Sequence, residues 1–550
     1  MEAMFLTIND EDREPLAAYK AVADPDVMYL HQAMKEKDKE DFIEAMHKEV
    51  NDQKDNGNFI ILQKDQVPRN KTILKSVWQM RRKRDIRTRA IKKYKARLNI
   101  NGSHMIKGID YDETYAPVAK WSTIRLILSL AAVHNWHTRQ LDYVLAFPQA
   151  PVERELYMEV PKGFVIEDGK SEDYLLKIKR NIYGQKQAGR VWNRYLVNKL
   201  TKELGFKQSS VDECLFYRGN VLYALYTDDS ILAGPSKQEV DKIIKQMREI
   251  KLDITDEGDV EDFLGVNIEK LPNGKIKLSQ PHLIDQILKD LNMSNDNVKI
   301  KDTPAASRNI LCKYKSSEDF DNSFHYRSVI GKLNYLEKCT RPDIAYAAHQ
   351  CARFTESPKV EHAKAVRWLA RYLKGTRDEG IILEPDESKH LNMYVDADFA
   401  GNWNRDEAEE RDNARSRHGY AITYMNCPIV WKSHMQTEIA LSSTESEYIG
   451  LSQGLLEAIP LMRILDKMKT YGMPIKDSTS KVYCRVFEDN SGALEMAKVH
   501  KYRPQTKHIN VKYHHFRDPV SDGRIKLYPI STTAQPADIF TKPLPRELLI

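Results

Sequence analysis

The sequence contains few cysteines and no long apolar run. Its 550 residues include six cysteines, which are far apart and never form a Cys-x-x-Cys pair. This spacing excludes a disulfide framework and the common zinc-site patterns, and it favours a reducing compartment. No apolar run approaches the roughly 18 residues of a membrane-spanning helix. The acidic N-terminus also lacks the basic and apolar regions of a secretory signal peptide. We therefore expect an intracellular protein that has no membrane partner.

A dominant charge is also missing from the composition. Lys and Arg number 85 and Asp and Glu number 79, which leaves a net charge of +6. The apolar fraction of 41% and the charged fraction of 30% are typical of globular chains. They exclude wholesale disorder and a fibrous protein. At about 100–200 residues per domain, the length predicts roughly three to five folding units.

The near-balance of charge hides one strongly basic stretch. Residues 71–97 contain twelve Lys or Arg and a single acid, Asp85. Trp78, Ile86 and Tyr94 interrupt the stretch, so that it can still pack against a core. Such local charge attracts polyphosphate, because each neutralised phosphate releases counterions. We interpret the stretch as a contact for nucleic acid or nucleotide. The alternatives are a solvated basic face and a localisation signal.

Hydrophobic periodicity predicts helices and strands over most of the chain. Helices are predicted at residues 35–56, 123–134, 187–204, 237–251, 281–293, 442–459 and 491–498, with two or three more before residue 378. Strands are predicted within 58–100 and at 174–182, 391–400, 419–424, 429–432, 482–487 and 525–530, and hairpins at 221–234 and 263–279. Residues 298–325 have no period and form the best linker candidate.

Two adjacent aspartates, Asp228 and Asp229, lie at the tip of a predicted hairpin whose flanks are apolar. Adjacent acids repel one another, so the pair costs stability unless a cation neutralises it. Asp142 ends another predicted strand. Three carboxylates placed in this way can hold two Mg²⁺ ions about 4 Å apart, which suits phosphoryl transfer. An ordinary Asp-rich turn is the alternative.

Six motifs resemble those of a known family, in the family's order. They are Tyr94-Lys95-Ala96-Arg97-Leu98, Glu113-Thr114-Tyr115-Ala116-Pro117-Val118, Leu141-Asp142 with Phe147, Ile182-Tyr183-Gly184-Gln185-Lys186-Gln187-Ala188, Tyr226-Thr227-Asp228-Asp229 and Phe263-Leu264-Gly265. Over roughly residues 35–545 the sequence resembles the reverse transcriptase–ribonuclease H segment of a Ty1/copia-type retrotransposon Pol polyprotein. Recognisable Gag, protease and integrase parts are missing, so we expect a segment of a longer polyprotein.

The resemblance implies roles for the motif residues of the polymerase half. Asp142, Asp228 and Asp229 would be its metal-binding carboxylates, and Lys95 and Arg97 would grip the incoming triphosphate. Phe147 matches a steric gate against a 2′-hydroxyl, and a core phenylalanine is the alternative reading. The remaining roles are a nucleotide and template-base pocket (Tyr183, Gly184, Lys186, Gln187) and a primer grip (Phe263, Leu264, Gly265, with the following Pro-Asn-Gly hairpin).

Two positions depart from the family's pattern beside the paired aspartates. Thr227 and Ser230 stand where the family commonly has Val and a Met or Ile. Because threonine is β-branched and tolerates a strand, we expect Thr227 to leave the hairpin undisturbed.

The C-terminal part resembles ribonuclease H in strand order and in the placement of its acids. The resemblance implies that Asp396, Glu447, Asp489 and Asp538 hold two Mg²⁺ ions that activate water against the RNA strand of a hybrid. Glu445 competes with Glu447, but residues two apart on a helix point away from each other, so only one can enter the site. We prefer Glu447, and Asp398 is likewise second to Asp396. Five basic residues between the third and fourth acids are interpreted as hybrid contacts: Lys498, Lys501, Arg503, Lys507 and His508.

These observations predict a multidomain α+β and α/β chain. A right-hand polymerase of fingers, palm and thumb is followed by a helical connection and an RNase H-like domain. The predicted parts are a loose leader at residues 1–34, fingers and palm at 35–280, thumb and connection at 281–390 with the linker near 298–325, and the nuclease at 391–550.

The resemblance implies an RNA- and DNA-directed DNA polymerase with ribonuclease H activity. Two Mg²⁺ ions, with Mn²⁺ as an alternative, would serve each site. The expected partners are an RNA template, a DNA primer, an RNA–DNA hybrid, dNTPs and other Pol segments such as integrase. The expected location is a cytoplasmic virus-like particle or the nucleus. The alternatives are a catalytically inactive remnant that still binds nucleic acid and a host-recruited structural protein.

Overall fold

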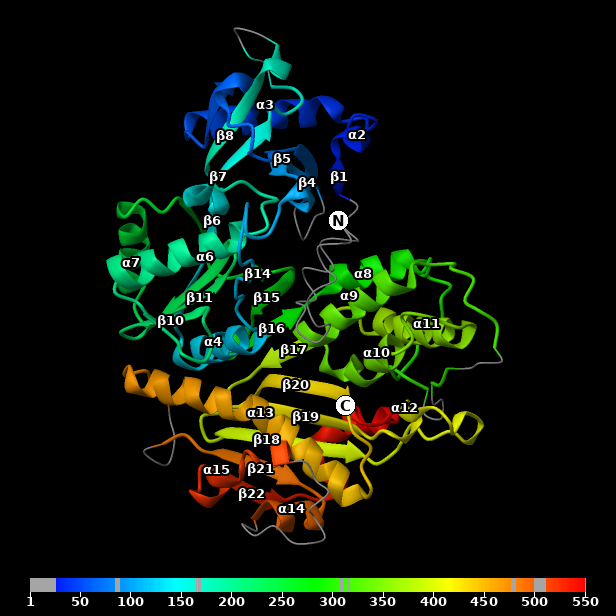
Figure 1. The fold of residues 1–550 in the computed structure, drawn as a ribbon. Helices are drawn as coiled ribbons and strands as arrows, with labels where there is room; N and C mark the ends of the chain where they lie inside the picture. The colour runs from blue at the N-terminus through cyan, green and yellow to red at the C-terminus, as the bar shows by residue number, and fades with distance from the viewer. Residues whose placement is uncertain are drawn as a thin grey trace.

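The computed structural model describes residues 26–84, 90–164, 166, 170–306, 311–313, 317–475, 481–498 and 511–549. Figure 1 shows four parts: two small sheets at the top, a larger sheet with its helices below them, a group of helices beside that sheet, and a C-terminal sheet at the bottom. Among the described helices, none has the length and apolar character needed to cross a membrane.

The uppermost part, the fingers, contains two sheets and a long helix. One sheet has the order β1-β4-β5 and the other β2-β8-β7-β3. Their strands are β1 (Val27–Tyr29), β2 (Phe59–Gln63), β3 (Ile73–Leu74), β4 (Ser76–Arg84), β5 (Ile91–Ile100), β7 (Pro151–Glu159) and β8 (Tyr174–Arg180). The helices are α2 (Leu30–Ala33) and α3 (Lys39–Asp55), and α3 packs on β5. Helix α3 confirms the helix predicted at 35–56.

The expectation of a loose leader up to residue 34 is wrong for residues 26–34. Strand β1 pairs antiparallel with β4, and the Asp26 carboxylate accepts a hydrogen bond from Arg84 Nε at 2.7 Å. Main-chain pairing and this ion pair hold a segment whose own sequence shows no period. The start of the fingers therefore includes residues that local patterning assigned to the leader.

The palm is a six-stranded antiparallel sheet of order β13-β6-β12-β11-β10-β9. Its strands are β6 (His137–Tyr143), β9 (Lys207–Gln208), β10 (Leu215–Arg218), β11 (Val221–Tyr226), β12 (Asp229–Gly234) and β13 (Ile254–Gly258). The helices of this part are α4 (Trp121–His134), α5 (Ala146–Gln149), α6 (Ala188–Asn198) and α7 (Lys237–Glu249), and α4 and α7 pack on the sheet. The helices predicted at 123–134, 187–204 and 237–251 are confirmed, the second continuing from α6 into a π-helical turn at Lys199–Glu203.

Beside the palm lie a third small sheet and four helices. The sheet has the order β14-β15-β16-β17, with strands β14 (Asp262–Phe263), β15 (Val266–Lys270), β16 (Ile276–Ser279) and β17 (Gly380–Leu383). The helices are α8 (Pro281–Asp290), α9 (Tyr326–Cys339), α10 (Ala345–Ala352) and α11 (Val360–Gly375). The described residues of 298–325 form no helix or strand, but Cys312, Phe320 and Phe324 are buried. This candidate linker is therefore packed against the helices.

The C-terminal part is a mixed sheet of order β20-β19-β18-β21-β22, in which β18 pairs antiparallel with β19 and parallel with β21. Its strands are β18 (Leu391–Asp398), β19 (Arg417–Tyr424), β20 (Cys427–Met435), β21 (Cys484–Glu488) and β22 (Ile525–Pro529). Its helices are α12 (Arg411–Ala414), α13 (Ser443–Thr470), α14 (Ser491–Lys498) and α15 (Arg517–Ser521). All five strands were predicted close to these positions.

The helix expected at 442–459 continues to Thr470, through Pro460. Proline inside a helix removes one hydrogen bond and crowds the preceding turn. Leu461, Met462 and Leu465 are buried beyond it. Their burial offsets the local cost, so that tertiary packing overrides the helix-stop signal.

Candidate active sites

The register of the palm sheet brings the first three aspartates together. Strands β6 and β12 are neighbours, and Asp142 lies directly opposite Asp229. Asp228 occupies the turn between β11 and β12, and its carbonyl accepts a hydrogen bond from the Tyr143 N–H at 2.9 Å. Burial raises the pKa of Asp142, and the nearby Asp228 carboxylate raises it further. The three carboxylates therefore share one end of two adjacent strands, as the sequence predicted.

The turn that carries Asp228 has a strained backbone. Thr227 adopts φ = +56°, a left-handed conformation that a β-branched residue rarely takes. The Trp192 indole N–H donates to the Thr227 carbonyl at 2.7 Å and holds the turn against α6. The hairpin of β11 and β12 forms as expected, but Thr227 belongs to its turn and not to a strand. Left-handed strain of this kind costs about 1–3 kcal/mol and is concentrated at functional sites.

The expected nucleotide pocket brings fingers and palm residues together. The ring centroids of Phe147 and Tyr183 lie 4.7 Å apart, and the Arg97 guanidinium lies 4.6 Å from the Tyr183 ring. Burial raises the pKa of Tyr183 to about 12, so its hydroxyl stays protonated. Lys186 Nζ donates to the Met105 carbonyl at 3.3 Å. Phe147 is therefore half-buried, because its ring packs against the palm core and also lies against this aromatic and cationic group.

Gly184 joins this pocket to the end of β5. It has φ = +89°, and the Ile100 N–H donates to the Tyr183 carbonyl at 2.8 Å. A Cβ on Gly184 would collide with the Ile100 carbonyl oxygen, and a Cβ on Gly102 would collide with the Gly184 carbonyl oxygen. The position of Tyr183 thus depends on close backbone contact between residues 100–102 and Gly184.

Strand alternation sorts the basic stretch into two faces. Arg82 and Arg84 face the N-terminal acids: Arg82 Nε donates to Asp38 at 2.7 Å, and Arg84 pairs with Asp26. On the opposite face, like charges lie directly across the β4–β5 ladder, with Arg81 opposite Lys95 and Lys83 opposite Lys93. Such pairs are destabilising unless an anion lies between them.

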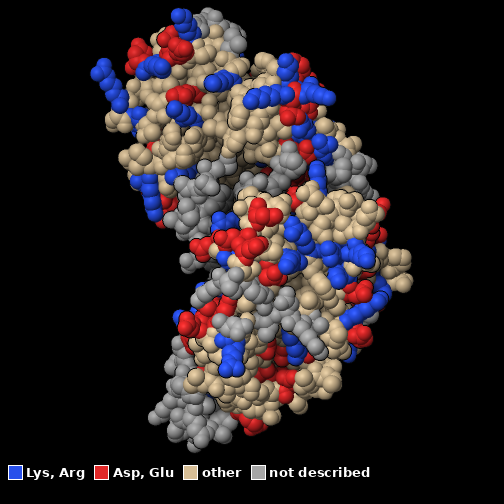
Figure 2. Space-filling view, turned by 90° about the vertical axis from the view of Figure 1, so that its right-hand side faces the viewer, with Lys and Arg blue, Asp and Glu red and all other residues tan. Residues whose placement is uncertain are grey.

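Lys95 belongs to the second of these faces. Burial lowers its pKa, Arg97 and Lys83 lower it further, and the field of Asp142 opposes them. This face is therefore electrostatically linked to the palm carboxylates. On the side of the molecule that Figure 2 shows, Lys and Arg lie interspersed with Asp and Glu.

The expected primer grip presents its main chain. Leu264 and Gly265 form a tight turn with φ of +55° and +77°, but the Phe263 and Leu264 side chains are buried. The Phe263 ring lies 6.5 Å from that of Trp121 in the palm. Any contact between this turn and a primer would therefore use its backbone groups and not the two apolar side chains.

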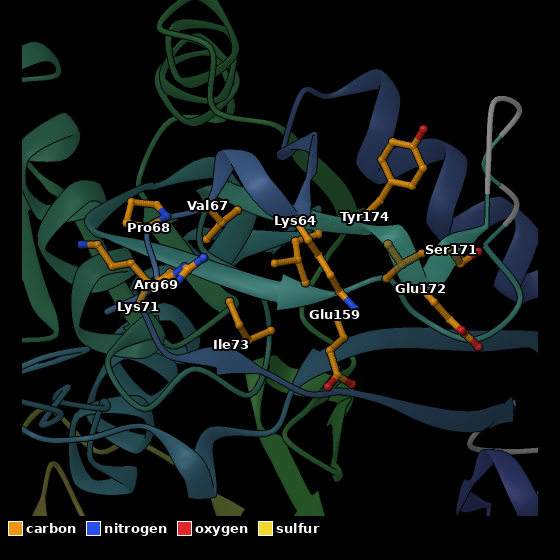
Figure 3. A pocket seen from close by; sticks show the side chains of 12 residues that line it. Lys64, Val67, Pro68, Arg69, Lys71, Ile73, Glu159, Ser171, Glu172 and Tyr174 are labelled. Atoms are coloured by element: carbon orange, nitrogen blue, oxygen red, sulfur yellow. The ribbon is translucent and has the colours of Figure 1, made fainter.

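A cavity of about 590 Å³ lies elsewhere in the fingers. Figure 3 shows side chains of both charges around it, among them Lys64, Arg69 and Glu159. Lys71, the first residue of the basic stretch, lines it, but none of the candidate carboxylates and none of the nucleotide-pocket residues does. The carboxylate sites are therefore shaped by strand ends and helix turns rather than by this hollow.

In the C-terminal part, three acids converge from three elements. Asp396 lies near the end of β18, Glu447 in the first turns of α13 and Asp489 directly after β21. Each offers an oxygen within 4.8 Å of the others. Asp538, in the short helix Pro536–Phe540, joins them through Lys542, whose Nζ lies 2.9 Å from Asp538 and 4.0 Å from Asp396.

The charge of this group is poorly compensated. Burial, together with the neighbouring carboxylates, raises the pKa of Asp396 to about 6 and that of Glu447 to about 11. The Thr541 hydroxyl donates to Asp396. Glu447 Oε2 is buried without a hydrogen-bond partner among the described residues. A cation at this position would relieve the repulsion.

Glu488 is an acid of this site that the sequence interpretation did not select. Its side chain is completely buried, and burial and nearby acids raise its pKa well above the ordinary value. The signal was present: Glu488 follows the buried Cys484 and Val486 at a spacing of two, which points it to the same face of β21.

The structure separates the two pairs of competing acids. The Glu445 carboxylate accepts from the Leu441 N–H at 2.8 Å, and its own N–H donates to Ser442 Oγ at 3.2 Å. Glu445 therefore caps α13, while Glu447 lies with Asp396. The Asp398 carboxylate lies against Gly401 in the loop after β18. Of the basic residues expected to contact a hybrid, Lys498 ends α14, whereas Lys501, Arg503, Lys507 and His508 lie outside the described residues.

Comparisons with known proteins show which family the chain belongs to. The family model described as reverse transcriptase (RNA-dependent DNA polymerase) matches residues 61–305, a range that includes Asp142, Asp228 and Asp229. The putative transposon Ty5-1 protein of Saccharomyces cerevisiae is 30% identical over 58% of this chain and is covered along its full length. The chain belongs to the Ty1/copia-type retrotransposon Pol polyproteins.

Longer members of this Pol family extend the match to the C-terminal part. The retrovirus-related Pol polyprotein of transposon TNT 1-94 from Nicotiana tabacum is 34% identical over 98% of this chain. The Pol polyprotein of transposon RE1 from Arabidopsis thaliana is 33% identical over 83% of it. The chain spans 39% and 30% of the length of these two relatives. It is thus similar to one segment of each of these polyproteins.

Among solved structures, a foamy viral protease-reverse transcriptase in complex with double-stranded DNA matches 89% of this chain and 69% of its own. The TM-score is 0.48 and the identity 12%. Asp396, Glu447 and Asp489 lie beyond the range of the reverse transcriptase model, but the alignment with the tobacco relative covers 98% of this chain.

Proposed function

We propose that this Pol segment is an RNA- and DNA-directed DNA polymerase joined to a ribonuclease H. It copies a retrotransposon RNA into DNA and degrades the RNA strand of the hybrid. The observation that carries the polymerase assignment is the direct pairing of Asp142 with Asp229, with Asp228 in the adjoining turn. The observation that favours the nuclease is the convergence of Asp396, Glu447 and Asp489.

The residue types at both sites suit divalent cations, and the acids of the C-terminal site also lie close enough together to share one. Carboxylate oxygens are the ligands that Mg²⁺ prefers, and Mn²⁺ accepts the same donors. The buried acids around Glu447, with their raised pKa values, lack compensating cations among the described side chains apart from Lys542. Asp142, Asp228 and Asp229 would hold the metals of one site, and Asp396, Glu447, Asp489 and Asp538 those of the other. When bound, such ions would neutralise the negative charge on the phosphoryl oxygens and lower the pKa of the attacking hydroxyl or water.

The chain's own side chains position the polymerase substrates. Lys95 and Arg97 face the palm carboxylates and supply positive charge to the dNTP triphosphate. The Phe147 ring stands against Tyr183 and excludes a 2′-hydroxyl by volume. The backbone of the Leu264 turn holds the primer end. Positioning and electrostatic stabilisation account for most of phosphoryl-transfer catalysis, so these contacts suffice for the reaction class.

The nuclease half receives what the polymerase half makes. Lys542, between Asp538 and Asp396, orients both carboxylates and offers a cation to a scissile phosphate. The partners that follow are an RNA template, a DNA primer, their hybrid and dNTPs, with other Pol segments such as integrase in a virus-like particle or the nucleus.

The polymerase assignment is tested by primer extension on poly(rA)/oligo(dT) with Mg²⁺. The intact chain should extend the primer, Asp228→Asn should abolish extension, and Asp296→Asn, at an exposed position, should not. Binding of the primer–template without any product would instead support an inactive remnant.

The nuclease assignment is tested on a labelled RNA–DNA hybrid. Asp396→Asn should abolish cleavage and leave primer extension intact. Cleavage that persists in this variant would contradict the proposed nuclease site.

A further inference from the structure

One buried arginine joins the palm, the helices beside the palm (the connection) and the C-terminal nuclease part. Arg125 lies on palm helix α4 and is 4% exposed. Its Nε donates to the Ile429 carbonyl in nuclease strand β20 at 2.8 Å. Its Nη1 donates to the Lys338 and Cys339 carbonyls at the end of α9, at 3.0 and 3.2 Å. Arg125 therefore bonds the palm, the connection and the nuclease at a single point.

An aromatic ring completes this junction. The Arg125 guanidinium lies 4.0 Å from the centroid of Trp431 in β20, and the Trp431 indole N–H donates to the Glu337 carbonyl of α9 at 3.0 Å. Each hydrogen bond of the junction ends on a main-chain carbonyl of another part, and those to Ile429, Cys339 and Glu337 are buried. Loss of the guanidinium would leave such carbonyls buried without a donor, which is costly.

The same helix reaches the primer grip. The Tyr335 hydroxyl donates to the Leu264 carbonyl at 2.5 Å, one helical turn before the α9 residues that meet Arg125. Gln280 Nε2 donates to the Gly265 carbonyl at 3.4 Å, and the Thr340 hydroxyl donates to Gln280 Oε1 at 3.0 Å. The last turn of α9 thus touches the turn proposed to hold the primer end on one side and the nuclease on the other.

The direct contact between palm and nuclease has a geometric consequence. Helix α4 lies beside β20 (Figure 1), and β20 belongs to the sheet that carries Asp396. Domains of one chain move relative to each other unless their interface is well fixed. Because a duplex advances about 3.4 Å per nucleotide, a displacement of that size moves a cut by one position.

We propose that Arg125 is a positioning residue that sets the length of hybrid between the last nucleotide added and the RNA cut. It does so by tying β20 and the end of α9 to the palm. This inference rests on the two activities proposed above. Arg125 contacts neither the substrate nor the carboxylates, so its role acts through the placement of the nuclease.

The test maps where the RNA is first cut. A labelled RNA annealed to a DNA primer with a recessed 3′-end is incubated with the full chain and Mg²⁺ under single-turnover conditions. The distance from the primer end to the first cut is then read for wild type, Arg125→Met and Trp431→Phe. Arg248→Met, at an exposed arginine of palm helix α7, is the matched control.

Wild type and Arg248→Met should cut in one narrow cluster of positions. Arg125→Met should spread the cluster by about one nucleotide or more, the step that the duplex rise defines. It should keep the dNTP incorporation rate and the cutting rate on a short hybrid that cannot reach both sites. Trp431→Phe keeps an aromatic ring beside Arg125 but removes the indole N–H donor, so it should spread the cuts less.

Three results would overturn the inference, in distinguishable ways. An unchanged cluster in both Arg125→Met and Trp431→Phe, with wild type active, removes the positioning role alone. If Arg125→Met does not fold, an unchanged cluster in Trp431→Phe decides against the inference. A wild-type chain that neither extends the primer nor cuts the hybrid removes the proposed function and this inference together.

Discussion

A methyl group on Gly184 should disable the nucleotide pocket without touching any carboxylate. Gly184 holds φ = +89°, which costs an L-residue about 1–2 kcal/mol. The added Cβ would lie 3.1 Å from the Ile100 nitrogen and closer still to its carbonyl oxygen. Restoring ordinary contact requires a displacement of about 1 Å between this loop and β5. Tyr183 directly precedes Gly184, so the Tyr183 ring, which faces Phe147, must move with this loop.

Misplacement of about 1 Å at a positioning residue can cost about 100-fold in rate. We therefore expect Gly184→Ala to lower kcat/KM for dNTP incorporation by about two orders of magnitude on this basis. Steady-state primer extension measures the effect. Hybrid cleavage should be unchanged, because the carboxylates proposed for it lie on the C-terminal sheet and the helices around it, apart from this loop.

Two further glycines separate conformational strain from collision. Gly57 has φ = +63° with open space around it, so Gly57→Ala should lose about 1–2 kcal/mol of stability and keep full activity. Gly102 lacks a left-handed φ, but its Cβ would collide with the Gly184 carbonyl oxygen, so Gly102→Ala should resemble Gly184→Ala in activity. Wild-type kinetics in both pocket variants would refute the reasoning.

Three other outcomes are expected. Glu447→Gln should abolish hybrid cleavage and spare primer extension. Glu445→Gln should cleave the hybrid normally but lose about 0.5–2 kcal/mol of stability, because a helix cap is weakened. Equal cleavage by both variants would contradict the different roles assigned to the two glutamates. Phe147→Ala should raise ribonucleotide relative to deoxynucleotide incorporation by about 10–200-fold in kcat/KM, the range for a steric pocket, and an unchanged ratio would favour a purely structural ring. Burial lowers the pKa of His362, whose Nδ1 accepts from the Lys359 N–H, so its folded form resists protonation and stability should fall as the pH drops below about 6.5. His362→Gln should weaken that dependence in thermal unfolding followed from pH 7.5 to 5, and identical pH profiles would exclude this histidine as the cause.

Elements whose apolar face must be buried could be predicted from the sequence. Helices α4 and α7 and the strands of the C-terminal sheet begin and end close to the expected residues, because their period is a local property. The continuation of α13 through Pro460 and the ordered structure of residues 26–34 could not be predicted in this way. There, packing of Leu461 and pairing of β1 with β4 outweigh the local signal.

The candidate carboxylates were also readable from the sequence, but their surroundings were not. Asp228 and Asp229 are neighbours in the chain, whereas the Asp142–Asp229 pairing depends on the register of strands β6 and β12. Left-handed Thr227 depends on where the hairpin turns. Glu488 could have been predicted, because strand alternation alone places it on the buried face of β21.

The sequence by itself determined which chemical groups are available: acids at strand ends, a basic stretch and an aromatic beside the first acid. Those features follow from residue type and local period. The tertiary structure alone decided which basic residues face the palm and which pair with N-terminal acids, because that depends on the face each strand presents. It also decided the role of Arg125, whose acceptor Ile429 lies 304 residues away. A contact at that separation has no local signature, because only the packing of three parts of the chain brings its two ends together.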